Sequence, residues 1–299
     1  MADYSGQADI RGINIDRAVK ALADEELKMK DFCQVVPTNA REIRYWTRTA
    51  GFLDSTDTTG ITASQIYNVA ERALPDVVEQ SWTRSTTYVK HFKVESPWIS
   101  IEDIKDTDVD IFTENLRDLV KAVANQVDKR IYNVISDTVT SVPADGTTVT
   151  SAAATDDGWD DTATGDPVTD LLAAKEHFRT YRFNPEGAVM VIHPTDYKNL
   201  IKFFINVKGS SVPQFASETV KNGTMSTILG IKVYVTTQAT TDYAVLFIPN
   251  VACLWKEFTP ISSFVIDEPG IAKKIRVIEE GEAVLVQPYA AYVITDTQV

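Results

Sequence analysis

Side chains that could support catalysis are few and lack the spacing that catalysis requires. The sequence holds three histidines, His91, His177 and His193, and two cysteines, Cys33 and Cys253. No histidine has a nucleophile or an acid–base partner at a recognisable spacing. The chain also has no phosphate-binding loop, nucleophile elbow, dinucleotide fingerprint or HExxH zinc motif. The cysteines lie outside any CxxC pair and are typical of buried thiols in a reducing cytosol. We therefore predict no catalytic residues and no cofactor.

One acidic run could bind a cation. The segment from Asp156 to Asp161 carries four carboxylates, which are ligands that calcium prefers. The segment does not match the twelve-residue calcium loop with its terminal glutamate, so a solvated acidic loop is the preferred interpretation. A glycosylation-like triplet, Asn222-Gly223-Thr224, is more simply a turn. We predict no metal site.

Basic and aromatic side chains interleave along two polar segments, and these could bind a partner. They could stack on nucleic acid, pair with acidic residues of neighbouring subunits, or form a solvated strand face. With 42 acidic and 29 basic residues, the net charge of −13 argues against a dedicated nucleic-acid reader. An acidic chain that self-associates needs complementary contacts, so we favour pairing between subunits. The candidate contact residues are Arg41, Arg44, Tyr45, Trp46, Arg48, Arg72, Trp82 and Arg84.

Two elements must position these residues. Alternating residues at 41–48 and 82–94 predict a long β-hairpin with a turn-rich tip at 55–60. Its strands are polar on both faces, so we expect its packing to come from elsewhere, on another chain. The stripe that starts at Phe112 and ends at Val134 predicts a helix over 108–137, about 45 Å long. We expect Asp106, Asp108 and Asp110 to cap it.

The remainder of the sequence predicts an arm followed by a mixed α/β region. Residues up to Lys30 read as a partly helical arm, and 141–166 as a surface loop or loose hairpin. Helices are expected over 168–181 and after Pro194, with a strand at 188–192 between them and a loop at 206–224. Further strands are expected at 231–236, 244–248, 252–255, 261–266, 274–278, 283–287 and 290–294.

Targeting signals are missing from the sequence. The N-terminus lacks the basic-then-apolar order of a signal peptide, and no apolar run approaches the roughly 20 residues needed to cross a bilayer. We expect the chain to be made and folded in the cytosol, with no membrane partner.

The order of these elements resembles the HK97-type major capsid proteins of tailed double-stranded DNA viruses. The hairpin is similar to the family's E-loop, 94–106 to the segment entering the spine helix, and 108–137 to that helix. Three further segments carry the resemblance: AVMVIHPTDY at 188–197, ILGIKVYV at 228–235 and IEEGEAVLVQPYA at 278–290. The resemblance implies an α+β fold with an N-terminal arm (1–40), an E-loop (41–93), a peripheral domain (94–145 and 258–299) and an axial domain (146–257).

The same resemblance implies a structural role. It predicts a virion subunit, assembled in the host cytoplasm, that forms hexamers and pentamers of an icosahedral shell around double-stranded DNA held without sequence specificity. Scaffolding, portal and decoration proteins are the expected partners. No lysine occurs between Lys30 and Lys90, so the isopeptide donor that some members carry in the E-loop is missing. The arm is too short for a scaffolding extension, which implies a separate scaffold or a processed chain.

The resemblance leaves other classes open. An encapsulin-like compartment shares the fold, and residues 15–27 could line its cargo pocket. An enzyme with an unfamiliar axial-domain site and a virion surface or tail protein are further alternatives. The missing catalytic motifs argue against the enzyme. The tail-protein alternative does not explain why a long helix and a polar hairpin occur together in one chain.

Overall fold

The computed structural model describes residues 28–50, 71, 74, 81–106, 111–136, 149–155, 158–161, 164–206 and 227–298. The described chain forms two compact units. The first draws on residues up to Ile43, on Tyr88–Ile131 and on Trp255–Glu282. The second draws on Arg44–Thr87, on Tyr132–Leu254 and on the chain from Ala283 onward. The chain therefore passes several times between the units, and each unit combines segments that are distant in sequence.

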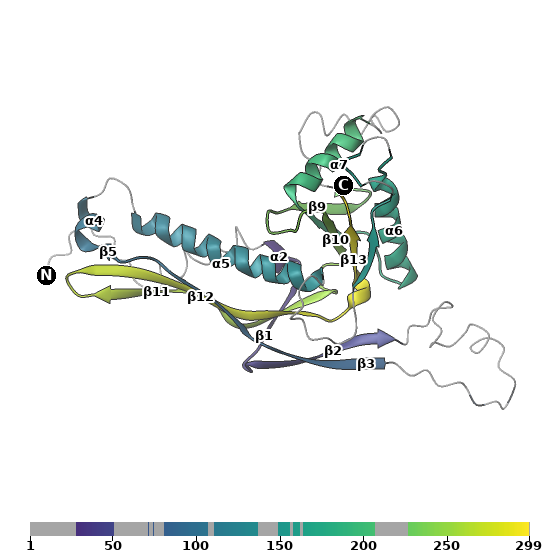
Figure 1. Cartoon of the computed structure of the whole chain (residues 1–299). Helices are drawn as coiled ribbons and strands as arrows, with labels where there is room; N and C mark the ends of the chain where they lie inside the picture. Colours follow the sequence, from purple (N-terminus) through teal and green to yellow (C-terminus); the bar gives the residue numbers. More distant parts are fainter. Residues whose placement is uncertain are drawn as a thin grey trace. The chain divides into compact units, whose positions relative to one another are not determined.

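The first unit combines a long helix with a sheet (Figure 1). Most of the helix α5 (Ile111–Ile135) and most of the strands β11 (Cys253–Glu268) and β12 (Ala272–Leu285) belong to it. The sheet has the order β1-β11-β12-β4, with β5 also paired to β12. Its remaining elements are α2 (Lys28–Asp31), β1 (Gln34–Pro37), β4 (Lys90–Glu95), β5 (Ile99–Ser100) and α4 (Ile101–Asp106).

The helix α5 forms because its apolar residues recur every three or four positions. Phe112, Leu116, Val123, Val127 and Ile131 are all buried, and the intervening positions are largely polar. The predicted helix over 108–137 is confirmed over Ile111–Ile135, and residues 108–110 and 137 lie outside the described residues. Of the three expected capping aspartates, Asp106 ends α4, and the other two lie outside the described residues.

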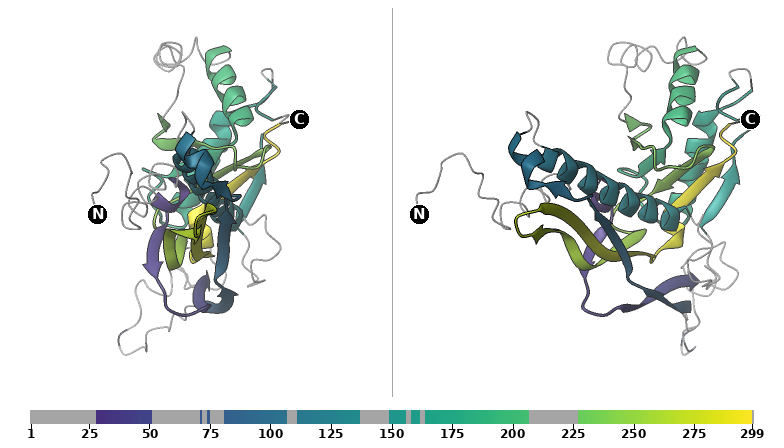
Figure 2. Two further views of the ribbon diagram at one scale, coloured as in Figure 1. Left: turned by 90° about the vertical axis from the view of Figure 1, so that its left-hand side faces the viewer. Right: turned by 60° about the vertical axis from the view of Figure 1, so that its left-hand side comes forward.

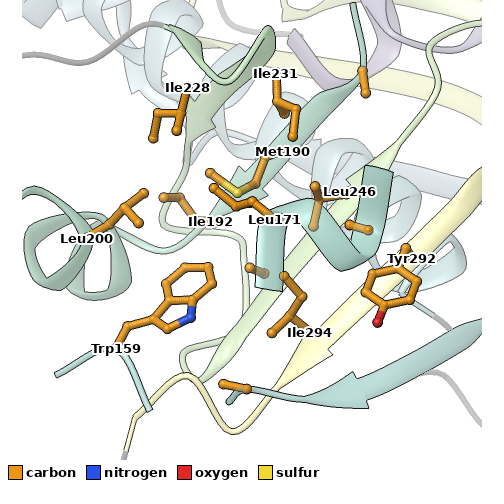
Figure 3. Close-up of a cluster of buried hydrophobic side chains, with 14 of the residues drawn as sticks. Trp159, Leu171, Met190, Ile192, Leu200, Ile228, Ile231, Leu246, Tyr292 and Ile294 are labelled. Atoms are coloured by element: carbon orange, nitrogen blue, oxygen red, sulfur yellow. The ribbon is translucent and has the colours of Figure 1, made fainter. Parts of the chain in front are cut away.

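The second unit holds a six-stranded mixed sheet with the order β6-β13-β10-β7-β9-β8. Strand β7 pairs antiparallel with β10 and parallel with β9. The helices α6 and α7 contribute Leu171, Phe178 and Leu200 to one core cluster with residues from five of the strands (Figure 3). The bounds are β6 Thr150–Ala153, α6 Pro167–Thr180, β7 Val189–Ile192, α7 Pro194–Asn206, β8 Thr227–Ile228, β9 Ile231–Val235, β10 Tyr243–Phe247, η1 Pro288–Ala290 and β13 Ala291–Thr295.

All four residues of β7 are buried, as expected for a strand covered on both faces. The structure thus contains the helix expected over 168–181, the strand at 188–192 and the helix after Pro194, with bounds one or two residues away.

Two pairs of predicted strands are in fact single long strands. The segments 252–255 and 261–266 both lie in β11, except for residue 252, and 274–278 and 283–287 both lie in β12, except for residues 286 and 287. Pro260 is exposed within β11, and a proline is tolerated where its nitrogen faces away from the neighbouring strand. Within β12, the acidic stretch Glu279-Glu280-Gly281-Glu282 continues the strand because cations from other elements pair with its carboxylates. Those cations are far away in sequence, so the local pattern did not reveal them.

The expectation of a surface loop or loose hairpin at 141–166 is wrong for its described part. Strand β6 pairs parallel with β13, and Trp159 is completely buried. The placement of β13 also differs from the expected domain boundaries. We assigned 258–299 to a peripheral domain, whereas β13 lies in the six-stranded sheet beside β10. The expected arm before Lys28 and the loop over 207–224 lie outside the described residues.

The hairpin consists of β2 (Glu42–Ala50) and β3 (Ser81–Tyr88), which form a two-stranded sheet of their own. The two strands run side by side in both views of Figure 2. Its predicted tip at 55–60 lies outside the described residues. Among the described helices, none is long and apolar enough to span a membrane.

Candidate assembly interface

The two faces of the β2–β3 hairpin differ in burial. Tyr45, Thr47, Ser85 and Thr87 are buried, and the Thr47 hydroxyl donates a hydrogen bond to the Leu285 carbonyl at 3.4 Å. One face of the hairpin is therefore packed within its own chain, contrary to the expectation that its packing would come from another chain. Tyr45 in particular belongs to this buried face and is not an accessible contact residue.

The opposite face carries cations and large aromatic rings. Trp46, Trp82 and Tyr88 are 54%, 45% and 63% exposed, and Arg44 and Arg84 are exposed between them. Because side chains alternate along a strand, residues two apart share one face. We call these five residues the cation–aromatic face. Large exposed aromatic rings with arginines are the composition that protein interfaces favour.

The remaining predicted contact residues are only partly described. Arg41 is exposed just before β2, in the first unit. Arg48 lies within β2, and Arg72 lies outside the described residues. Tyr88 was missing from the predicted set, although its spacing of two from residue 86 and six from Trp82 places it on the same side of β3. Strand alternation alone would have identified it.

Cations on the first unit's sheet pair with carboxylates of the same chain. Lys274 lies 2.8 Å from the carboxylate of Glu95, and Arg276 pairs with the same group. Hydrogen bonds from Lys274 and then Arg276 hold the pKa of Glu95 below its ordinary value. The Lys274 ammonium also lies 4.9 Å from the ring centroid of Trp98, which is half exposed. These contacts stabilise local geometry on an exposed surface and contribute little to folding.

The three histidines occupy structural positions. The Nδ1 of His91 lies 2.8 Å from Glu280, and the Nδ1 of His193 lies 3.0 Å from the Thr195 hydroxyl. His177 packs among aromatic rings, with centroids 4.9 Å from Tyr181 and 5.1 Å from Tyr292. None of these partners forms a nucleophile–base pair.

The burial of His177 predicts a pH effect on stability. Burial lowers its pKa below the ordinary value of 6.5, and a hydrogen bond to the backbone of Tyr289 only partly offsets this. The folded state therefore binds a proton less readily than the unfolded state, so the free energy of unfolding falls as pH drops below about 6.5. We expect the His177→Phe variant to lose this part of the pH dependence in urea titrations between pH 7 and 5. The exposed His91→Gln variant is the control, and an unchanged slope in His177→Phe would contradict the assignment.

The candidate cation site has no support in the described residues. Asp156 and Asp157 lie outside them, while Asp160 and Asp161 directly follow the buried Trp159. Among the described residues, no group of three or more histidine, cysteine or acidic side chains could hold a metal ion. Both cysteines are buried thiols.

A long helix against a sheet, a second unit around a mixed sheet, and a hairpin with an exposed cation–aromatic face are consistent with an HK97-like fold. The sequence profile described as phage capsid protein matches residues 98–292, well over half of the chain. The chain belongs to the phage capsid protein family. This is a family of structural proteins and not of enzymes, so the chain is a major capsid subunit and a component of the virion.

Solved structures agree with this fold. The capsid structure of cyanophage P-SCSP1u has a TM-score of 0.64 and 12% identity, covering 99% of this chain and 92% of that one. A virus-like particle from Pyrococcus furiosus has a TM-score of 0.62 and 11% identity, covering 94% and 98%. A protein of Mycobacterium phage Che8 has a TM-score of 0.59 and 13% identity, covering 100% and 96%. A search of curated protein sequences gave no match.

Proposed function

We propose that the subunit forms hexamers and pentamers that close an icosahedral shell around double-stranded DNA. The observation that carries this proposal is the two-sided hairpin, which is packed in its own chain on one face and presents Trp46 and Trp82 on the other. Large apolar rings that remain exposed in a single chain mark a protein-contact surface. In this arrangement, the first unit corresponds to the peripheral domain and the six-stranded sheet to the axial domain.

The proposed contact partner of the cation–aromatic face is the acidic surface of a neighbouring copy. A chain with a net charge of −13 repels its own copies, and arginines at the contact offset that repulsion locally. The same net charge would let packaged DNA move along an acidic wall without sequence-specific attachment. Scaffolding, portal and decoration proteins belong to this proposal, as does assembly in the host cytoplasm.

Electron microscopy of the purified protein, with light scattering to measure mass, tests the proposal. Closed shells, or rings of five and six subunits, are the expected result. Nucleic acid recovered from shells made in infected or expressing cells would support the viral assignment, whereas shells that hold a docked enzyme would favour a cellular compartment. A protein that stays monomeric at all concentrations, salts and scaffold additions would contradict the proposal.

The cation–aromatic face gives a direct variant test. Replacing Trp46 and Trp82 together by serine should lower the unfolding free energy of the subunit by no more than about 3 kcal/mol, because about half of each side chain is exposed. Shell yield should fall at least about tenfold at concentrations where the unmodified protein assembles, since buried aromatic anchors dominate interface energy. Sedimentation analysis measures the yield.

A matched control replaces an exposed apolar residue elsewhere. Leu172 on α6 is 51% exposed, and this exposed fraction is similar to those of Trp46 and Trp82. The Leu172→Ser variant therefore removes exposed apolar surface from a different element. The proposal requires Leu172→Ser to assemble normally. Equal losses in both variants would indicate a general effect of surface polarity and not a contact made by the hairpin.

A further inference from the structure

A short segment of the first unit, Lys28–Pro37, lies at the edge of the sheet, and we call it the strap. It consists of α2 and β1, and β1 is the outermost strand beside β11. Just beyond the strap, the Thr38 amide donates a 2.8 Å hydrogen bond to the Glu257 carbonyl. The strap contributes two buried apolar anchors, Met29 and Cys33. Three of the four residues of β1 are exposed, so its apolar contribution is small.

The strap also inserts one charge into the sheet. The Lys30 ammonium lies 2.7 Å from a carboxylate oxygen of Glu257 and 3.0 Å from one of Glu279. It lies 5.9 Å from the ring centroid of Trp255, which is completely buried. The Glu279 side chain is fully buried as well, and its second carboxylate oxygen accepts no hydrogen bond. One cation from α2 thus joins two carboxylates from adjacent strands.

Burial and the attraction between Lys30 and Glu279 shift the pKa values of these two groups. Burial raises the pKa of Glu279, although Lys30 opposes the rise. Burial also opposes protonation of Lys30, but the charge of Glu279 and hydrogen bonds to both carboxylates outweigh it and raise the pKa of Lys30 above 10.5. A proton taken up by Glu279 would leave the Lys30–Glu257 pair intact and the site neutral.

Other charged groups of these elements are directed to their own partners. On β12, Glu280 pairs with His91 and Lys93 of β4, and Glu282 pairs with Arg130 of α5. On the strap itself, Asp31 is exposed. Lys30 is therefore the cation that faces Glu257 and Glu279 in the described structure.

We propose that Lys28–Pro37 opens and closes on the sheet as a unit, and that Lys30 is the latch that holds it closed in both neutral and mildly acidic solution. Without the Lys30 charge, a closed strap would keep the Glu279 carboxylate buried and uncompensated, which is strongly unfavourable. Apart from this ion pair, the strap is held by two buried apolar side chains, Met29 and Cys33, and by a four-residue edge strand. Segments at such edges can open independently of the rest of a fold.

The sign of the pH dependence distinguishes this latch from an ordinary ion pair. In this proposal, opening the strap brings Glu279 into water, so the pKa of Glu279 is higher in the closed strap than in the open one. Protonation of Glu279 as pH falls therefore stabilises the closed strap and does not open it. Lys30 contributes stability below pH 10.5 that is lost as pH rises through its raised pKa. The strap should therefore remain closed at pH 5 and open in alkali.

Hydrogen exchange of the full chain, followed by mass spectrometry on peptides covering 28–38, tests the latch. After correction for intrinsic exchange rates, protection of the strap should be equal or greater at pH 5 than at pH 7. In Lys30→Met, protection of the strap should fall at least about tenfold, while peptides from α5 remain unchanged. In Glu279→Gln, which mimics the protonated carboxyl, protection should stay within about threefold of the unmodified protein.

Three outcomes would overturn the proposal. Unchanged strap protection in Lys30→Met would show that the charge does not hold the strap. An equal loss of protection in α5 would show that the strap does not open separately. A loss in Glu279→Gln as large as in Lys30→Met, or opening of the unmodified strap at pH 5, would show that both charges are needed.

Discussion

Replacing Trp159 by alanine should lower the free energy of unfolding by about 3–5 kcal/mol, the range for truncating a buried tryptophan. The indole is completely buried, and its Nε1 donates a 2.8 Å hydrogen bond to Asp170 on α6. Its ring lies in the cluster formed by both helices and the six-stranded sheet, as Figure 3 shows. The Trp159 amide also donates to the Thr297 carbonyl at 2.8 Å, beyond the end of β13.

Urea titration followed by circular dichroism measures this loss of stability. Two further variants separate the contribution of the hydrogen bond from that of the buried ring and provide an exposed control. Trp159→Phe keeps most of the apolar volume but loses the donor to Asp170, so we expect a cost of about 1–3 kcal/mol. Asp170 would still accept bonds from the Thr155 amide and hydroxyl. The exposed control Leu172→Ala should change stability by less than about 0.5 kcal/mol. A cost below about 1 kcal/mol for Trp159→Ala would mean that the cluster does not depend on the ring.

The contrast between α5 and the Trp159 segment explains which parts of the fold the sequence predicts. Helix α5 was predicted because its buried stripe is local and repeats over 25 residues. Trp159 lies in a stretch rich in threonine, aspartate and glycine, and its partners Asp170 and Thr297 are 11 and 138 residues away. Local periodicity holds no information on such contacts. The same reason hid the continuity of β12, whose acidic stretch needs Lys30, Lys93 and Arg130.

The candidate interface was predictable to a similar degree. The alternation of Arg44 and Trp46, and of Trp82 and Arg84, was visible in the sequence, and these four residues do share the exposed side of their strands. Which side of a polar hairpin is buried depends on the surface it meets, and that surface comes from residues near Leu285. Tyr45 was therefore assigned to the interface on composition alone, and it lies on the side that is buried within its own chain.

Gly281→Ala should destabilise the first unit by about 3 kcal/mol, near the upper end of the usual cost of overpacking a core. A β-carbon at this position would lie 2.7 Å from Cε2 of Trp255, closer still to Cζ2, and 3.0 Å from the Lys256 carbonyl oxygen. The backbone of Gly281 is not in the left-handed region, so space and not conformation requires glycine here. The indole is completely buried and cannot move aside without displacing its neighbours, Phe92 among them.

A rescue variant separates this clash from a general loss of strand structure. Trp255→Leu alone should be destabilising because it leaves a cavity, but adding Gly281→Ala to it should cost less than about 1 kcal/mol, because the new methyl group then fills part of that cavity. The double-mutant cycle therefore predicts a favourable coupling of about 2 kcal/mol between the two positions. If the costs of Gly281→Ala and Trp255→Leu simply add, the destabilisation by Gly281→Ala comes from the backbone of β12 and not from a clash with the Trp255 ring. Strong coupling would show that Gly281 leaves the space that the Trp255 ring occupies beside β12. The acidic residues on either side of this glycine can then pair with cations from α2, β4 and α5.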